Sequence, residues 1–567
     1  MYSQMKTAIN EKLSVKPKTA AKIGLVTSIF VIIASIMGVG IFFKNGAVFR
    51  TNGGNPYGIL VSWILTGIIA IFTAISFAEV VTVKQKENFG NGLGGYVSEL
   101  NGYNIGRATR IWMPTFYYAA KTLACSCYIG TTFVYLGYCM TDDPRQDWLG
   151  SAKDFTTLVI MAIAMTLTGI FITIHYFSEK AGPALTRALT IIKFIPIVLV
   201  AVVAIVAISR HDAGGWIYKY YNQKDPTQPS VAADFDMAKV LDCIPGIMFT
   251  FDGFLCIGNI ASKVDKPEKN VSLALIFGMI IVIVLNIIVT VSLITIGSAD
   301  PFGMFMTAFV AGGASTETAV TAAKWLALIM ALLIILSGMG PLNSYCMIAP
   351  QACKEGIDSE TFMFGKQLKK LRNGDTRLGG FLYFAAIMLF YYIAFGLPSC
   401  ILNTIQIFDG TGATIVLFCF CIYAYNVLGG LINRKTKKHE VRKFKAFPIL
   451  APIAVLGCAF VFLYSLVYTY TILPINDMNG KWTVWGLAFT PLSWNETRAN
   501  GGTNLYSWEA MIVFWCTIAF FIAYPFINDG VLKATNKDYP HALMWQRNKH
   551  FETIVEVNKN KAPEIVS

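Results

Sequence analysis

The chain has 567 residues, of which 55% are hydrophobic and only 14% are charged, and its mean hydropathy is +0.55. Because a soluble protein carries about 25% charged residues, this composition excludes an ordinary water-soluble protein. The formal net charge of +13 is explained by basic loops and by attraction to anionic membrane lipids, so it requires no nucleic-acid partner.

Long apolar runs recur along the chain, and each is long enough to cross the hydrocarbon core of a bilayer as a helix of about 20 residues. We therefore predict an all-α polytopic membrane protein rather than a β-barrel, whose strands would be short and alternating. The twelve predicted spans are residues 24–49, 57–83, 111–140, 155–177, 186–209, 239–262, 271–298, 324–349, 379–398, 401–432, 447–472 and 508–528.

Basic residues predict the orientation of these spans. Loop 433–446 contains seven Lys/Arg residues and loop 350–378 contains six, whereas loop 141–154 is acidic. The positive-inside rule then places both basic loops in the cytoplasm, together with the tails 1–23 and 529–567. The expected location is the plasma membrane, which the chain crosses many times.

Glycines interrupt the first and sixth spans. Gly38 and Gly40 lie in the middle of span 1, and Asp252-Gly253 lies near the middle of span 6. A helix break frees backbone polar groups that lipid cannot satisfy, so it survives only where it lines a polar cavity. A single break can reflect close helix packing. Two breaks five spans apart are typical of the substrate site between two inverted repeats of a transporter.

Several segments resemble motifs of the amino acid–polyamine–organocation (APC) permeases. "MGVGIFF" at 37–43 resembles their G-S-G-I-F motif, with Val39 in place of serine, and "FTFDGF" at 249–254 resembles their F-A-Y-D-G-W/F stretch. "LSGMGPLNSYCMIAPQACKEG" at 336–356 resembles their span 8 and the loop after it. Because such matches run in order over residues 20–430, the chain is identified as a member of the APC superfamily.

The resemblance implies a fold and a function. It implies the leucine-transporter fold, with residues 24–209 and 239–432 as five-span inverted repeats, discontinuous helices 1 and 6, and peripheral spans at 447–528. It also implies a secondary active transporter that moves an α-amino acid by alternating access, with no cofactor. The sequence contains no Walker phosphate loop, H-E-x-x-H motif or G-x-S-x-G elbow, so we expect no enzyme activity, catalytic residue or metal site.

The two breaks supply the predicted substrate contacts. Free carbonyls at the end of the inner half of span 1 suit an ammonium group, and free N–H groups at the start of its outer half suit a carboxylate. Span 6 adds carbonyls for the ammonium. The predicted substrate-binding residues of the breaks are Ile36, Met37, Gly38, Val39, Gly40, Phe249, Thr250, Phe251 and Asp252.

Lys121 lies ~16 Å into span 3 at the helical rise per residue. An ionisable residue at that depth is a functional candidate by default. Lys121 can contact the substrate, which would favour acidic amino acids, or it can form an ion pair with Asp252, which would leave a pocket for neutral ones. We expect a slight preference for acidic amino acids.

Lys193 lies only ~9 Å from the cytoplasmic end of span 5, so its ammonium could snorkel to the membrane surface. The alternative follows from the resemblance: Lys193 would stand in for the sodium ion of sodium-coupled relatives and bridge the span 1 break to Ser337. Transport would then be sodium-independent, with proton coupling and amino acid exchange as equal alternatives. Asp409 is expected to cap a helix rather than to face the outer vestibule.

The sequence does not fix the oligomeric state or which amino acid is carried. A non-transporting amino acid receptor on the same fold is the alternative function.

Overall fold

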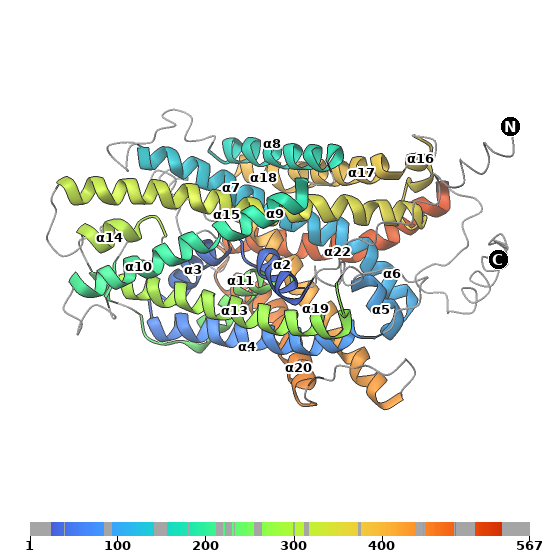
Figure 1. Ribbon diagram of the computed structural model, residues 1–567, viewed down its shortest axis with the longest axis horizontal. Helices are drawn as coiled ribbons and strands as arrows, with labels where there is room; N and C mark the ends of the chain where they lie inside the picture. Colours follow the sequence, from blue (N-terminus) through green and yellow to red (C-terminus); the bar gives the residue numbers. More distant parts are fainter. Residues whose placement is uncertain are drawn as a thin grey trace, which may run out of the picture.

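The structure is a computed structural model that describes residues 24–38, 40–83, 93–140, 156–178, 181–210, 219–221, 229–231, 233–254, 264–298, 301–310, 317–371, 376–436, 446, 448–480, 482 and 505–535. Most of these residues are helical, and most long helices run roughly along the longest dimension of the molecule (Figure 1). The predicted helical membrane architecture is confirmed in this respect.

The elements follow one another along the chain with short connections. The first half contains α2 (Leu25–Ile36), α3 (Gly40–Thr51), α4 (Pro56–Val81), α5 (Leu93–Asn101), α6 (Tyr103–Trp112), η2 (Met113–Tyr118), α7 (Ala119–Met140), α8 (Thr156–Phe177), α9 (Ala181–Ile192) and α10 (Phe194–Arg210). The second half contains α11 (Met237–Phe251), α13 (Pro267–Ile296), α14 (Met304–Val310), α15 (Glu317–Asp358), α16 (Gly365–Lys370), α17 (Thr376–Tyr391), η5 (Tyr392–Gly396), α18 (Leu397–Ile401), α19 (Gln406–Thr436), α20 (Leu450–Tyr464), η6 (Ser465–Ile472), α21 (Leu473–Asn476) and α22 (Ser507–Thr535).

Two departures from continuous α-helix stand out. The segments η2, η5 and η6 are π-helical, and each continues directly from or into an α-helix. The strands β1 (Lys219–Tyr221) and β2 (Pro229–Val231) pair antiparallel. The all-α prediction therefore missed one small hairpin, which lies between α10 and α11.

Nine helices of the described chain are long and apolar enough to cross a membrane, and the bent pair α2–α3 raises the number to ten. Predicted spans 3 and 6 are not among them. Span 3 falls on η2 and α7, which contain Lys121 among several hydroxyl residues. Span 6 falls on α11, a helix of 15 residues that ends at the break. The count of twelve spans and the inverted repeat remain predictions.

Both predicted breaks are present and they touch each other. Helices α2 and α3 are bent by 46° where they meet. Helix α11 ends at Phe251, and Gly253 follows with φ +123°, a conformation that side chains other than glycine rarely adopt. A β-carbon on Gly253 would lie 2.6 Å from the carbonyl oxygen of Ser35. The chain after α11 therefore packs directly against the end of α2.

The short helices mark the two ends of the bundle. Helices α5, α6 and α16 lie at one end, and α14 lies at the opposite end (Figure 1). This arrangement agrees with the sequence prediction that loops 84–110 and 350–378 share one side of the membrane and loop 299–323 lies on the other. Assigning the first side to the cytoplasm still rests on the positive-inside rule.

A buried ion pair at this end joins α6 to α22. The guanidinium of Arg107 faces the carboxylate of Asp529 with two hydrogen bonds, one of them 2.9 Å long. Both side chains are almost completely buried. Because a bidentate pair satisfies both ions, it fixes the angle at which α22 packs on the rest of the bundle.

We predict that Arg107→Met lowers the free energy of unfolding by about 3–5 kcal/mol, because it leaves the buried carboxylate of Asp529 without a cation. Lys354→Met is the matched control, since the pair of Lys354 with Asp358 is 34% and 44% exposed. The control should cost less than about 1 kcal/mol. Thermal unfolding of both variants in detergent measures the difference, and equal melting temperatures would contradict the prediction.

Candidate functional site

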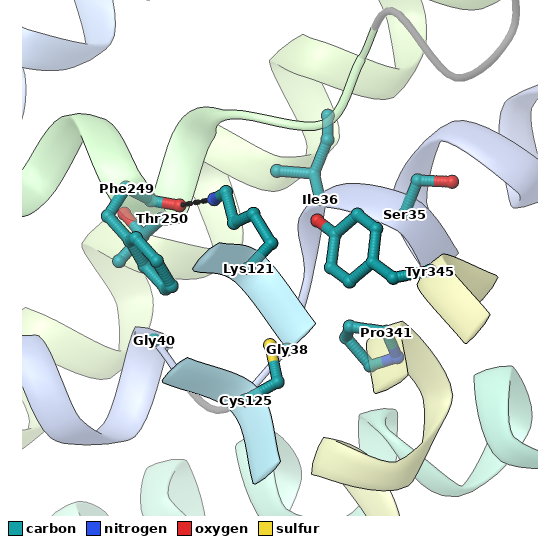
Figure 2. A pocket seen from close by; sticks show the side chains of 10 residues that line it. All are labelled: Ser35, Ile36, Gly38, Gly40, Lys121, Cys125, Phe249, Thr250, Pro341 and Tyr345. Carbon is teal, nitrogen blue, oxygen red and sulfur yellow. Dashed lines mark hydrogen bonds between the residues drawn. The ribbon is translucent and has the colours of Figure 1, made fainter. Parts of the chain in front are cut away.

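A narrow cavity lies where the two breaks meet α7 and α15 (Figure 2). It leaves room for about one water molecule, so the protein is closed around it. The lining residues are Ser35, Ile36, Gly38, Gly40, Lys121, Cys125, Phe249, Thr250, Pro341 and Tyr345. Six of the predicted substrate-binding residues are among them. Met37, Phe251 and Asp252 are buried beside the cavity without lining it, and Val39 lies outside the described residues.

The end of α2 exposes backbone carbonyls to the interior, because the last carbonyls of a helix have no donor within that helix. The carbonyl of Ile33 accepts the N–H of Met37 at 2.8 Å. The ammonium of Lys193 donates to the carbonyls of Ala34 and Met37, each at 2.6 Å. Ser35 and Ile36 lie between these two and form part of the cavity wall.

Lys193 is placed at the break by an interruption between α9 and α10. It is 1% exposed, so its side chain reaches into the protein and does not snorkel to the membrane surface. A β-carbon on Gly340 would lie 2.8 Å from the Lys193 Nζ atom. The contact with α15 is therefore at Gly340. Among the described residues no hydrogen bond joins Lys193 to Ser337, which is buried one turn earlier, so this part of the expected bridge is not present.

Lys121 projects from α7 toward the end of α11. Its Nζ atom donates to the carbonyl of Phe249 at 3.0 Å and lies 3.2 Å from Asp252 Oδ2. The other oxygen of Asp252 accepts the hydroxyl of Tyr423 at 3.0 Å. The ion pair, one of the two alternatives for Lys121, is thus formed here. The positive charge beside the cavity is compensated, and Lys121 takes a carbonyl that we expected to serve the substrate.

The sequence analysis missed Lys44, which lies one turn beyond Gly40 in α3. Lys44 is 2% exposed, and its ammonium donates to the carboxylate of Asp409, which also accepts the hydroxyl of Tyr128. Asp409 lies in the first turn of α19, as expected for a cap, but it is buried and ion-paired. A lysine inside an apolar span was the signal that could have revealed this pair.

The ring of Phe249 lies between the two lysines. Lys121 Nζ is 3.7 Å from the ring centroid and Lys44 Nζ is 5.3 Å from it. Both distances are within the range of cation–π attraction. The ring of Phe249 therefore connects the charged pair beside the cavity with the charged pair in α3 and α19.

Glycine at positions 38 and 40 allows the break to pack closely against its neighbours. A β-carbon on Gly38 would lie 2.7 Å from Cγ of Pro341, and one on Gly40 would lie 2.8 Å from Cγ2 of Thr250. Neither distance is compatible with a side chain unless its neighbour moves. The two glycines therefore set the distances from span 1 to α15 and α11, and through them the shape of the cavity.

We predict that Gly40→Ala weakens ligand binding and lowers stability by about 1–3 kcal/mol, because the new methyl group overpacks against Thr250. Thr250→Ser removes the contacting Cγ2 atom and keeps a hydroxyl, so the double variant should recover most of the loss. Gly246→Ala in α11 is the control, since no atom lies within 4 Å of its β-carbon position. Thermal unfolding with and without ligand tests this, and a double variant no better than Gly40→Ala would refute the contact.

Comparisons with known proteins agree with this geometry. A family model described as amino acid permease matches residues 23–492. The b(0,+)-type amino acid transporter 1 of Homo sapiens is 24% identical over 78% of the chain and 82% of its own length. The serine/threonine exchanger SteT of Bacillus subtilis is 23% identical over 79% of the chain and 91% of its length. A protein of Mycoplasma pneumoniae described as uncharacterized is 23% identical over 78% and 83%.

Proposed function

Because the chain belongs to the amino acid permease family of the APC superfamily, we propose that it is a secondary active transporter that moves an α-amino acid across the plasma membrane. Relatives of the chain are transporters and not enzymes. The observation that carries the proposal is the closed cavity between two broken helices, whose walls include backbone as well as side chains. An amino acid differs from other small molecules in having an ammonium and a carboxylate on one carbon, and the break offers a complement to each.

The proposed pose follows from helix geometry. The carbonyls of Ser35 and Ile36 at the end of α2 would accept the substrate ammonium. The N–H groups at the start of α3, from Gly40 onward, would donate to the substrate carboxylate, where the helix dipole is positive. The side chain would then extend toward α7 and α15.

The cavity wall facing that side chain favours neutral amino acids. Its members from α7 and α15 include Cys125, Pro341 and Tyr345, which carry no charge. Lys121 is neutralised by Asp252, and recruiting it to an acidic substrate would leave Asp252 buried without its cation. We therefore prefer the neutral alternative to the slight acidic preference of the sequence analysis. The name of the Bacillus relative, a serine/threonine exchanger, is consistent with this preference.

Alternating access needs a barrier on each side of the cavity, and both are present in this closed form. Toward the end that carries α14, the pair of Lys44 and Asp409 joins α3 to α19 above the ring of Phe249. Toward the other end, Phe254 packs against Phe77 and Tyr423, with ring centroids 6.3 and 5.3 Å away. We propose that separating the first group opens the site outward and separating the second opens it inward.

Lys193 suggests how transport is driven. Its ammonium holds two carbonyls of the span 1 break, where a bound cation would otherwise be needed to compensate them. We propose that this fixed positive charge makes transport independent of sodium. Proton-coupled uptake and amino acid exchange both remain compatible with the site.

Uptake of a labelled neutral amino acid into proteoliposomes should be unchanged when choline replaces sodium at constant pH and membrane potential. The reason is that Lys193 already supplies the positive charge at the break. A strict requirement for sodium would refute the role of Lys193. Binding without any saturable flux would instead refute the transporter and favour a receptor.

Competition assays test the preference for neutral substrates. Unlabelled serine, threonine, alanine or leucine should reduce uptake of a labelled neutral amino acid, whereas glutamate and aspartate should not. Lys121→Met alone should destabilise the protein by about 3–5 kcal/mol, since it leaves Asp252 unpaired. The double variant Lys121→Met/Asp252→Asn should regain much of that stability. Competition by glutamate that disappears in the double variant would show that Lys121 contacts an acidic substrate.

A further inference from the structure

Four buried carboxylates of the described chain lie in ion pairs, namely Glu79, Asp252, Asp409 and Asp529. Asp242 in α11 is different. Its side chain is 6% exposed, and its Oδ1 atom accepts the hydroxyl of Thr469 in η6 at 2.8 Å. Among the described residues no lysine or arginine lies within ion-pairing distance of it. Asp242 is thus a buried carboxyl whose hydrogen-bond partner is neutral.

The other titratable groups around Asp242 do not supply a positive charge. Tyr464, at the end of α20, places its hydroxyl beside the carboxyl. Asp236, just before α11, and Cys243, the next residue in the helix, are the remaining titratable neighbours. In α3, which also packs against α11, Lys44 is already held by Asp409. The surroundings of Asp242 therefore favour a carboxyl group without charge.

Burial of an ionised carboxylate with a single hydroxyl donor is costly, because nothing replaces its hydration or balances its charge. A protonated carboxyl avoids this cost and can also donate a hydrogen bond. The packing of α11 against η6 is consequently most stable with a proton on Asp242. Once α11 moves away and water enters, ionisation becomes favourable. Proton binding is therefore linked to the position of α11.

Asp242 lies near the outer end of α11, ~8 Å from the start of the helix. At this end the N–H of Ala233 bonds to the carbonyl of Gly53, just after α3, so the outer ends of both broken spans are joined. Pro245 lies within α11 and removes one backbone hydrogen bond, which lets the outer turns tilt relative to Phe249. On the other side, η6 is a π-helical turn, a feature frequent at functional sites.

We propose that Asp242 is a proton-binding site through which the pH on the outer side controls closure of α11 over the cavity. This inference rests on the proposed transport function and on the predicted orientation. Proton binding allows α11 to pack on η6 and close the site, whereas loss of the proton holds α11 away. Uptake should therefore be fast at acidic external pH and should fall as the external pH rises.

The test uses the full chain in proteoliposomes with a fixed internal pH and an external pH varied from about 5 to about 8, the range in which physiological acid–base switches work. Wild-type uptake of a neutral amino acid should fall several-fold across this range. Asp242→Asn, which mimics the neutral carboxyl, should transport with a flat profile. Asp236→Asn is the matched control. It is exposed, and because asparagine also caps helices it should keep the wild-type slope.

A second readout does not depend on transport or on the folding of a variant. Infrared spectra of the purified wild-type protein, made with isotope-labelled aspartate, should show a protonated carboxyl band that shifts with the label and decreases as the pH rises. The band should be missing in Asp242→Asn. Its absence from the wild type, a wild-type uptake that ignores external pH, or an Asp242→Asn profile that keeps its slope would each overturn the inference. Failure of wild-type uptake for every amino acid, with the band present, would instead refute the transport function alone.

Discussion

A bilayer offers no hydrogen bonds to an interrupted helix, and this constraint governs the centre of the molecule. The carbonyls released at the end of α2 are held by the ammonium of Lys193, and the chain at Gly253 packs against the carbonyl of Ser35. Two breaks that would each be unstable alone thus support one another. The cavity exists because the protein satisfies most of this backbone itself and leaves a small part of it for a ligand.

Charge compensation is the second organising constraint. Two buried lysines, Lys44 and Lys121, lie on either side of the Phe249 ring, and each has its own carboxylate. Such pairs are costly to break on one side, so they change partners only when helices move as units. The outer pair joins α3 to α19, and the inner pair joins α7 to the end of α11. Movement of the helices that carry substrate contacts therefore has to rearrange charge as well as apolar packing.

The sequence predicted the helical membrane class, the two breaks and the family, because glycine pairs and apolar length are local signals. Lys193 was also placed at the span 1 break through the family resemblance. Other features depend on packing that no local pattern encodes. The partner of Lys121 could not be chosen from its depth alone, since a substrate and Asp252 satisfy the same requirement. The contact of Lys193 with Gly340 rather than Ser337 differs by one helical turn, which spacing cannot resolve. Lys44 and Asp409 are 365 positions apart, so their pairing emerges only in three dimensions.

The central claim is that the amino acid binds in the cavity between the two breaks, and Cys125 offers a direct way to test it. Its thiol lines the cavity, whereas Cys516 is exposed on the surface of α22. Alkylation of each cysteine by a membrane-permeant maleimide can be followed by mass spectrometry of the reconstituted protein, with and without a saturating transported amino acid. The account predicts that substrate slows alkylation of Cys125 and leaves that of Cys516 unchanged. Equal rates at Cys125 with and without substrate would contradict it.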